Sequence, residues 1–573
     1  MIKRLAGAVR QYKRDAILAP VFVTMEAVME VVIPLLMSFL IDNGIEKGDM
    51  GYIGKIGLLL ALCAVVSLLF GVLSGRCAAR ASTGFAANLR KDMYYAVQDF
   101  SFSNIDKFST GSIVTRLTTD VTNVQNAFQM IIRIAVRAPM MLIFALVMAI
   151  SMNARLSLIF LAAIPILGGG MIFLSTKAHP VFAQMFKRYD RLNTIVQENL
   201  RGIRVVKAYV REEHEKEKFT DASEEIRKTS VRAEKILAFN SPLMQFCMYG
   251  AMLLISWIGA KLIVSNTMTT GQLMSMMSYA AQILMSLMML SMIFVMTIMS
   301  RASAQRIVEL LNEESDIKDG EKNLMEVKDG SIKFENVEFR YKKGGRPCLS
   351  EIDLDIASGQ TVGILGGTGT GKSSLVQLIP RLYDVASGRV LVGGEDVRDY
   401  NIEALREAVA MVLQKNELFS GTIKENLRWG NENATDEEIE HVCKLAQADS
   451  FIREVPDGYD THIEQGGTNV SGGQKQRLCI ARALLKKPKV LILDDSTSAV
   501  DTQTDALIRE AFRKEIPNTT KIIIAQRVAS VQDADQIVIM DGGKVVDVGD
   551  HDTLLKTSEI YREVFESQRK GEN

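Results

Sequence analysis

Six long apolar runs constrain this chain more than any other feature of its sequence. They cover residues 16–41, 52–75, 131–152, 156–176, 240–264 and 275–299. A helix needs about 20 apolar residues to cross the ~30 Å hydrocarbon core of a bilayer, and each run is long enough. Beyond about residue 300 charged and apolar residues mix, as they do in soluble α/β proteins. The sequence therefore predicts a membrane-spanning α-helical bundle over residues 1–319 and a soluble domain over residues 320–573.

The distribution of Lys and Arg predicts how the spans are oriented. Five lie in residues 1–15, six in 76–130 and fourteen in 177–236, whereas the intervening external loops hold very few. Basic residues concentrate on the cytoplasmic side of membrane proteins, so we expect a multi-pass protein of the cell membrane with both termini and the soluble domain in the cytoplasm. The basic segment 1–15 leads directly into a long apolar run, which favours an interfacial helix over a cleaved signal peptide.

The two long internal segments are predicted to continue the membrane helices into the cytoplasm. No proline occurs between Pro34 and Pro139 or between Pro180 and Pro242, so no forced break interrupts these helices. A third helix running from about Ser112 to Met152 would be about 60 Å long. The turns around residues 104–112 and 210–219 would then lie within reach of a soluble domain.

Two glutamates inside the first span have two interpretations. Glu26 and Glu30 lie one helical turn apart on the same face. They could form part of a site for cationic or polar substrates, or they could pair with Arg133 or Arg137 in the bundle interior. The last span carries nine methionines between Met274 and Met299, a composition that suits an adaptable binding wall but also ordinary packing.

Composition excludes several other classes. The 67 basic and 67 acidic residues balance, so no global basic surface indicates nucleic acid as a partner. The six cysteines are scattered without C-x-x-C pairs, which supports neither a disulfide framework nor a zinc site.

A phosphate-binding loop follows the apolar stretch QTVGIL. The segment GGTGTGKSS fits the pattern G-x-x-x-x-G-K-[ST] and precedes a helical pattern, as the motif requires. Backbone N–H groups of such a loop surround phosphates, the lysine reaches the terminal phosphates, and the hydroxyl after it ligates Mg²⁺. The predicted ATP-binding residues here are Gly366, Gly367, Thr368, Gly369, Thr370, Gly371, Lys372, Ser373 and Ser374.

Two further stretches complete the predicted nucleotide machinery. VLILDDSTSAVD begins as a buried strand and ends in Asp494, a carboxylate in position to orient Mg²⁺. VSGGQ enters a helical pattern, so the hydroxyl and amides of this loop are suited to bind phosphate. Its residues are Ser471, Gly472, Gly473 and Gln474.

The full chain resembles an ATP-binding-cassette (ABC) transporter half of the exporter type, with six spans fused to one P-loop domain that contains a helical subdomain. The resemblance implies that Tyr341 stacks on adenine, that Gln414 joins Mg²⁺ to the membrane-domain contacts, and that SAVD, ending at Asp501, crosses a dimer interface. It also implies that two such chains enclose two ATP molecules. Each ATP lies between one chain's P-loop and the other chain's VSGGQ loop, so a partner half is expected.

Three positions depart from the family pattern. In the family, the catalytic base is a Glu that directly follows the Walker-B aspartate, which is Asp494 here; this chain has Asp495 instead. The family's switch histidine is here Gln526. Gln465 replaces the usual Glu before the family's signature loop, which is VSGGQ in this chain. Asp is one methylene shorter than Glu, and Gln cannot carry charge. The combination resembles the degenerate half of a heterodimeric exporter, in which this chain's own ATP site is slow.

The predicted function is therefore ATP-driven export of small amphipathic molecules, drug-like or lipid-like, by alternating access. The alternatives are a homodimeric exporter of lipid or peptide, and an ATP-gated channel or regulatory protein built on the same scaffold. ATP, Mg²⁺, a second exporter half and membrane lipids are the expected partners.

Overall fold

The chain divides into two compact units. In a computed structural model, one unit comprises Met1–Gln98 and Ser109–Glu313, and the other comprises Asp99–Phe108 and Glu314–Asn573. The structure describes all residues except 343, 496–499 and 572–573, and describes only the backbone of residues 179, 183, 291, 294, 295, 298, 299, 570 and 571. Six long apolar helices followed by an α/β domain confirm the predicted fold class.

All regular secondary structure among the described residues of the first unit is helical. The predicted six spans correspond to six helical segments, each long and apolar enough to cross a membrane. The helices are α1 (Ile2–Gly7), α2 (Lys13–Leu40), α3 (Met50–Gln98), α5 (Thr110–Thr115), α6 (Val121–Met152), α7 (Ala154–Arg201), α8 (Ile203–Ala208), α9 (Glu212–Leu237), α10 (Asn240–Val264) and α11 (Thr270–Leu311).

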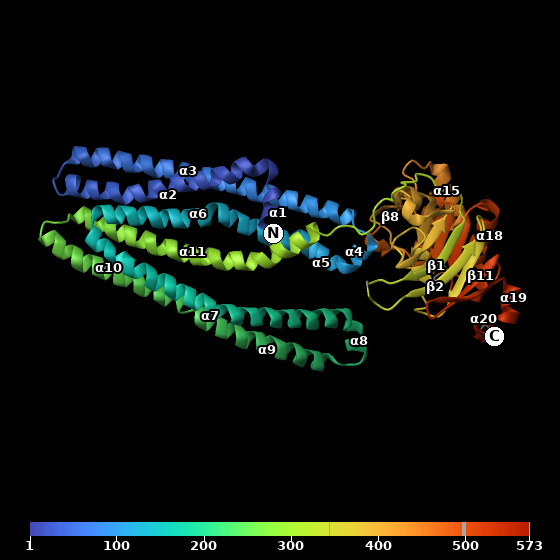
Figure 1. Ribbon diagram of the computed structural model, residues 1–573. Helices are drawn as coiled ribbons and strands as arrows, with labels where there is room; N and C mark the ends of the chain where they lie inside the picture. Colours follow the sequence, from blue (N-terminus) through green and yellow to red (C-terminus); the bar gives the residue numbers. More distant parts are fainter. Residues whose placement is uncertain (343, 496–499, 572–573) are drawn as a thin grey trace. The chain divides into compact units, whose positions relative to one another are not determined.

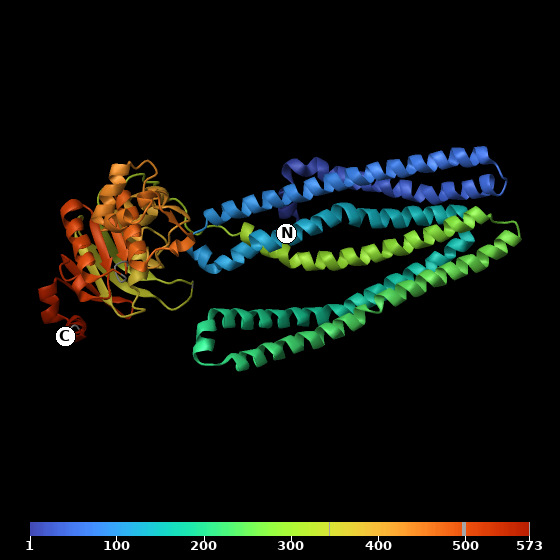
Figure 2. The same cartoon turned by 180° about the vertical axis from the view of Figure 1, so that it is seen from behind.

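Within this unit the helices form two groups. Helices α2, α3, α6 and α11 lie side by side, while α7 packs with α9 and α10 in a limb that α8 closes at its end (Figures 1 and 2). The expected third helix is continuous from Thr110 to Met152, with one wider turn at Arg116–Asp120. The second internal turn is displaced from its predicted position at 210–219, because α9 already begins at Glu212 and the chain reverses at residues 202–211.

The second unit contains the short helix α4 (Phe102–Lys107) and the whole C-terminal region. Its six-stranded sheet has the order β12-β11-β3-β10-β9-β6, and a four-stranded antiparallel sheet has the order β2-β1-β4-β5. The strands are β1 (Ile332–Phe339), β2 (Leu349–Ile356), β3 (Thr361–Gly366), β4 (Ser387–Val392), β5 (Glu395–Asp396), β6 (Val409–Val412), β7 (Gly421–Thr422), β8 (His462–Ile463), β9 (Val490–Asp494), β10 (Thr520–Ile524), β11 (Gln536–Asp541) and β12 (Lys544–Gly549).

Strand register determines where the polar residues of this unit gather. Strands β3, β10, β9 and β6 run parallel, and their pairing places Ile524 beside both Ile364 and Asp494. All residues of β9 and β10 are buried, which matches strands covered on both faces. The carboxyl ends of these strands therefore meet at one edge of the sheet, the edge at which α/β proteins bind ligands.

Helices cover this sheet and form the helical subdomain. They are α12 (Lys372–Gln377), α13 (Ile402–Ala408), α14 (Ile423–Arg428), α15 (Asp436–Leu445), α16 (Asp449–Glu454), α17 (Gly472–Leu485), α18 (Thr502–Glu515), α19 (His551–Thr557) and α20 (Glu559–Gly571). One core packs α14–α17 against the strands β6 and β9, and a second core joins the two larger sheets.

Candidate functional site

The phosphate-binding loop connects β3 to α12 with a backbone that requires glycine. Gly371, which precedes the first residue of α12, has φ of 93°. A Cβ on Gly366 would lie 2.3 Å from the carbonyl oxygen of Met540 on β11. Side chains are excluded at the first position by backbone conformation and at the second by the neighbouring strand. The amides of the loop can consequently approach a phosphate closely.

Lys372 lies over this loop. Its ammonium donates hydrogen bonds to the carbonyl oxygens of Gly366 (2.8 Å) and Gly367 (2.7 Å). Burial lowers the pKa of the Lys372 ammonium, and the carboxylates of Asp494 and Asp495 oppose that shift. A partly desolvated cation at the carboxyl edge of the sheet attracts phosphate more strongly than a lysine in bulk water.

Ser373 and Asp494, both expected from the sequence to contribute to a magnesium site, contact each other. The Ser373 hydroxyl donates to Asp494 Oδ1 at 2.9 Å, and Asp494 is only 3% exposed. Burial raises the pKa of the Asp494 carboxyl, while the hydrogen bond from Ser373 opposes the rise. A hydroxyl and a carboxylate side by side are hard oxygen donors of the kind Mg²⁺ prefers, so these residues fit a phosphate-bound magnesium ion.

Asp495 and Gln526 also contact each other. Asp495 follows β9 with φ of 50°, a left-handed conformation that Asp tolerates better than most residues. Gln526 stands two residues beyond β10, the neighbouring strand. The Gln526 side-chain amide donates to Asp495 Oδ2 at 2.8 Å. Two of the three positions that depart from the family pattern are therefore joined directly.

Tyr341 belongs to an aromatic cluster beside the phosphate-binding helix. Its ring packs edge-on against Tyr383, with 5.3 Å between the ring centroids, and its hydroxyl lies 2.8 Å from Ser374 Oγ. The exposed fraction of Tyr341 is 48%, so part of its ring remains accessible to the adenine ring of a nucleotide. The Tyr383 hydroxyl donates to Asp106 of α4 at 2.7 Å. Sequence reasoning did not single out Tyr383, whose partner is 277 residues away.

Within the part of the chain that the structure describes, no hydrogen bond joins the side chain of Gln414 or Gln465 to the phosphate-binding loop, Asp494 or Asp495. Gln414 is exposed two residues beyond β6, the strand next to β9, and thus at the same edge of the sheet as Asp494. Gln465 is exposed in the short turn before the signature loop. That turn is tied to the segment after β6, because the Gly466 amide donates to the Leu418 carbonyl at 3.0 Å.

The signature loop forms the N-terminus of α17. Ser471 caps this helix by accepting from the Gln474 amide, and the Gln474 side chain accepts in return from the Ser471 amide at 2.9 Å. Gly472 and Gly473 form the first turn. Asp501 caps α18 by accepting from the Thr504 amide, whereas Ser498 and Ala499 of the predicted SAVD loop lie outside the described residues.

In the membrane unit the two glutamates of α2 pair with Arg137 of α6. Arg137 donates to Glu26 Oε1 at 2.6 Å and to both oxygens of Glu30 at 2.6 and 2.8 Å. Of the two arginines named from the sequence, Arg137 is the one whose ion pairs with these glutamates occur among the described residues. Glu26 is 7% exposed, and its second oxygen has no hydrogen-bond partner among the described residues.

The methionine-rich span is helix α11, and its methionines do not share one environment. Met276 is fully buried, whereas Met285 and Met292 are more than half exposed. The Met299 side chain lies outside what the structure describes.

Family models match both units. Residues 16–307 match the ABC transporter transmembrane region, and residues 349–498 match the ABC transporter family model. An uncharacterised ABC transporter ATP-binding protein, YfiB of Bacillus subtilis, is 38% identical over 567 residues, covering 99% of this chain and 98% of YfiB.

Two further comparisons extend over the same length. The ATP-dependent lipid A-core flippase of Desulfotalea psychrophila is 32% identical over 587 residues, with 99% of both chains covered. The structure of a bacterial Atm1-family ABC exporter with ATP bound superimposes with a TM-score of 0.84 at 23% identity, covering 97% of this chain and 99% of that one. This chain belongs to the ABC transporter family and is a fused exporter, an ATP-binding membrane ATPase with six spans and one nucleotide-binding domain.

Proposed function

We propose that this chain is the degenerate-site half of a heterodimeric exporter of small amphipathic molecules. In this proposal its VSGGQ loop completes the active ATP site on the partner's P-loop, and its own P-loop site hydrolyses ATP slowly. The membrane domain spans residues 1–319 and the nucleotide domain residues 320–573, with both termini in the cytoplasm, as the distribution of basic residues supports.

The observation that carries the proposal is the hydrogen bond between Gln526 and Asp495. A general base must come within hydrogen-bond reach of the water it activates, and a misplacement near 1 Å costs on the order of 10²-fold in rate. Asp495 has a shorter side chain than the Glu of the family pattern, and one of its oxygens accepts from Gln526. Gln526 can donate to a γ-phosphate but cannot supply the positive charge of a histidine.

The proposed roles of the other residues follow from their positions. Ser373, Asp494 and Gln414 would hold Mg²⁺, which neutralises charge on the β- and γ-phosphates when it is bound. Tyr341 would stack on adenine, and the loop from Gly366 to Ser374 would surround the phosphates. Closure of two nucleotide domains around ATP would reorient the membrane helices, and hydrolysis at the active site would reset them.

Two measurements on the purified full-length protein test the proposal. Alone in nanodiscs, the chain should bind ATP but turn it over slowly, and addition of its partner half should restore drug- or lipid-stimulated ATPase activity. Robust turnover by the chain alone, undiminished by Asp495→Asn, would refute the heterodimer assignment and leave a homodimer. ATP-driven uptake into proteoliposomes, measured against passive ion conductance, separates an exporter from an ATP-gated channel.

Within the proposed class of small amphipathic molecules, the cargo is either drug-like or lipid-like. The similarity over 587 residues to a lipid A-core flippase supports the lipid-like cargo. Comparing the stimulation of the ATPase by amphipathic cations and by dispersed phospholipid or glycolipid would distinguish the two cargoes.

A further inference from the structure

The loop that carries Gln526 is held by a side chain from the C-terminal helix. Gln568 on α20 accepts a hydrogen bond from the Val528 amide at 2.8 Å through Oε1. Through Nε2 it donates to the Gln526 carbonyl oxygen, also at 2.8 Å. One primary amide thus binds two backbone groups that stand two residues apart and lie 40 and 42 residues away in sequence.

This pairing matches the geometry of a parallel sheet. In a parallel ladder, the carbonyl of one residue and the amide two positions later both bond to a single residue on the neighbouring strand. The Gln568 side chain reproduces that arrangement just beyond β10, where the backbone ladder ends. Both an acceptor and a donor are needed, and the side-chain amide of Gln carries both on one planar group.

Helix α20 is fixed well enough to place this amide. Tyr561 is 1% exposed, and its hydroxyl lies 2.6 Å from His551 Nδ1. Phe565 packs against the same hydrophobic core that includes Val528. The backbone that presents Gln568 is therefore anchored on the domain core.

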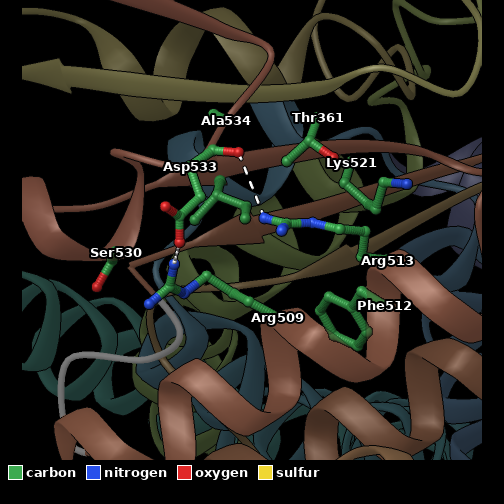
Figure 3. A pocket seen from close by; sticks show the side chains of 9 residues that line it. Thr361, Arg509, Phe512, Arg513, Lys521, Ser530, Asp533 and Ala534 are labelled. Atoms are coloured by element: carbon green, nitrogen blue, oxygen red, sulfur yellow. Dashed lines mark hydrogen bonds and ion pairs between the residues drawn. The ribbon is translucent and has the colours of Figure 1, made fainter. Parts of the chain in front are cut away.

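The far end of the loop is attached to α18. The Ser530 hydroxyl donates to Asp505 at 2.9 Å, and Asp505 is 4% exposed. Arg509, one turn later on α18, bonds Asp533 in the small pocket shown in Figure 3, where Ser530 also lines the wall. The loop is thus held by α20 at its start and by α18 at its end. The Gln526 side chain extends from the start of the loop, where Gln568 bonds the backbone.

We infer that Gln568 is a positioning residue. It holds the Gln526 backbone so that the Gln526 side-chain amide stays beside Asp495, where the γ-phosphate of ATP would bind. The inference rests on the proposed role of Gln526 in contacting the γ-phosphate. Gln568 itself touches neither the nucleotide loop nor Asp495 in the described contacts. Its effect should therefore be confined to the discrimination between ATP and ADP.

The test measures Mg–ATP and Mg–ADP dissociation constants of the full-length chain in nanodiscs. Gln526→Ala should weaken ATP binding roughly five- to tenfold without changing ADP binding, because a hydrogen bond to a charged phosphate is lost. Gln568→Ala should produce most of the same loss, and Gln526→Ala/Gln568→Ala should be no worse than Gln526→Ala alone. Glu566→Ala, on the exposed face of α20, is the matched control and should change neither constant.

Hydrogen exchange provides a second readout that does not depend on nucleotide. The Val528 amide should exchange faster in Gln568→Ala than in Glu566→Ala, while β10 retains its protection. If Gln526→Ala lowers the ATP preference and Gln568→Ala does not, the positioning role is wrong and the proposed function stands. If neither variant changes the preference, the γ-phosphate role of Gln526 fails and the inference fails with it. Equal weakening of ATP and ADP by Gln568→Ala, or unchanged exchange at Val528, would also overturn it.

Discussion

Replacing Arg137 by methionine should destabilise the membrane domain by removing the charge that neutralises two carboxylates. Arg137 makes three hydrogen bonds of 2.6–2.8 Å to Glu26 and Glu30. The Glu26 side chain is only 10% exposed, so removing its partner leaves a charge stranded in an apolar bundle. Breaking a buried pair in this way costs about 3–5 kcal/mol.

The expected size of the effect lies at the lower end of that range. The Arg137 and Glu30 side chains are 25% and 28% exposed, and solvent screens their part of the interaction. A loss of about 3 kcal/mol corresponds to a fall of about 5 °C in the thermal midpoint of a domain of this size. Arg133→Met, one turn earlier on α6, is the matched control, since no ion pair of Arg133 occurs among the described residues.

The assay is a thermal scan of the detergent-solubilised protein at a fixed rate. The triple variant Glu26→Gln/Glu30→Gln/Arg137→Met should recover most of the lost stability, because no unpaired charge remains. A midpoint for Arg137→Met within about 1 °C of the unmodified protein would refute the reasoning. So would a triple variant that melts below Arg137→Met, since the penalty would then not come from stranded carboxylates.

Three further outcomes are expected at the nucleotide sites. In a complex with a catalytically inactive partner, Asp495→Glu combined with Gln526→His should raise the single-turnover rate of ATP hydrolysis by on the order of 10²-fold. An unchanged rate would show that other residues make the site slow. Ser373→Ala should weaken Mg–ATP binding roughly tenfold by titration calorimetry but leave ATP binding in EDTA unaltered, and an equal loss in EDTA would argue against a role in holding Mg²⁺. Ser471→Ala should remove a helix cap worth about 1 kcal/mol and lower the ATPase activity of the complex. Ser471→Asn keeps the cap and should leave the thermal midpoint unchanged. Identical thermal midpoints for the two variants would contradict the capping argument.

The parts of the nucleotide site that sequence reasoning located are those encoded by short contiguous segments. The phosphate-binding loop needs a strand, glycines and a helix start within about ten residues, and its geometry follows from local backbone rules. Asp494 could be placed because a continuous apolar run predicts a buried parallel strand with its carboxyl end at the ligand edge. In the structure the Ser373 hydroxyl lies 2.9 Å from Asp494 Oδ1.

Contacts between distant segments could not be derived in this way. Nothing near Tyr383 in the sequence indicates Asp106, and nothing near Gln526 indicates Gln568. Each of these bonds depends on how two separately formed helices or loops dock on one core. A hydrogen-bonding side chain has the same local signature whether it faces solvent or a partner.

The sequence by itself determined the six spans and the α/β nucleotide domain, and it predicted which residues stand at the carboxyl edge of the sheet, because apolar length and strand–loop–helix motifs act over short distances. Only the tertiary structure decided which partners those residues have. Arg133 and Arg137 lie one turn apart on the same helix, so periodicity left both open as partners of Glu26 and Glu30. The packing of α6 on α2 selects Arg137. Likewise, strand register brings Asp494 beside Ile524 and so allows Gln526 to reach Asp495, because neighbouring strands fix distances that the chain's order does not.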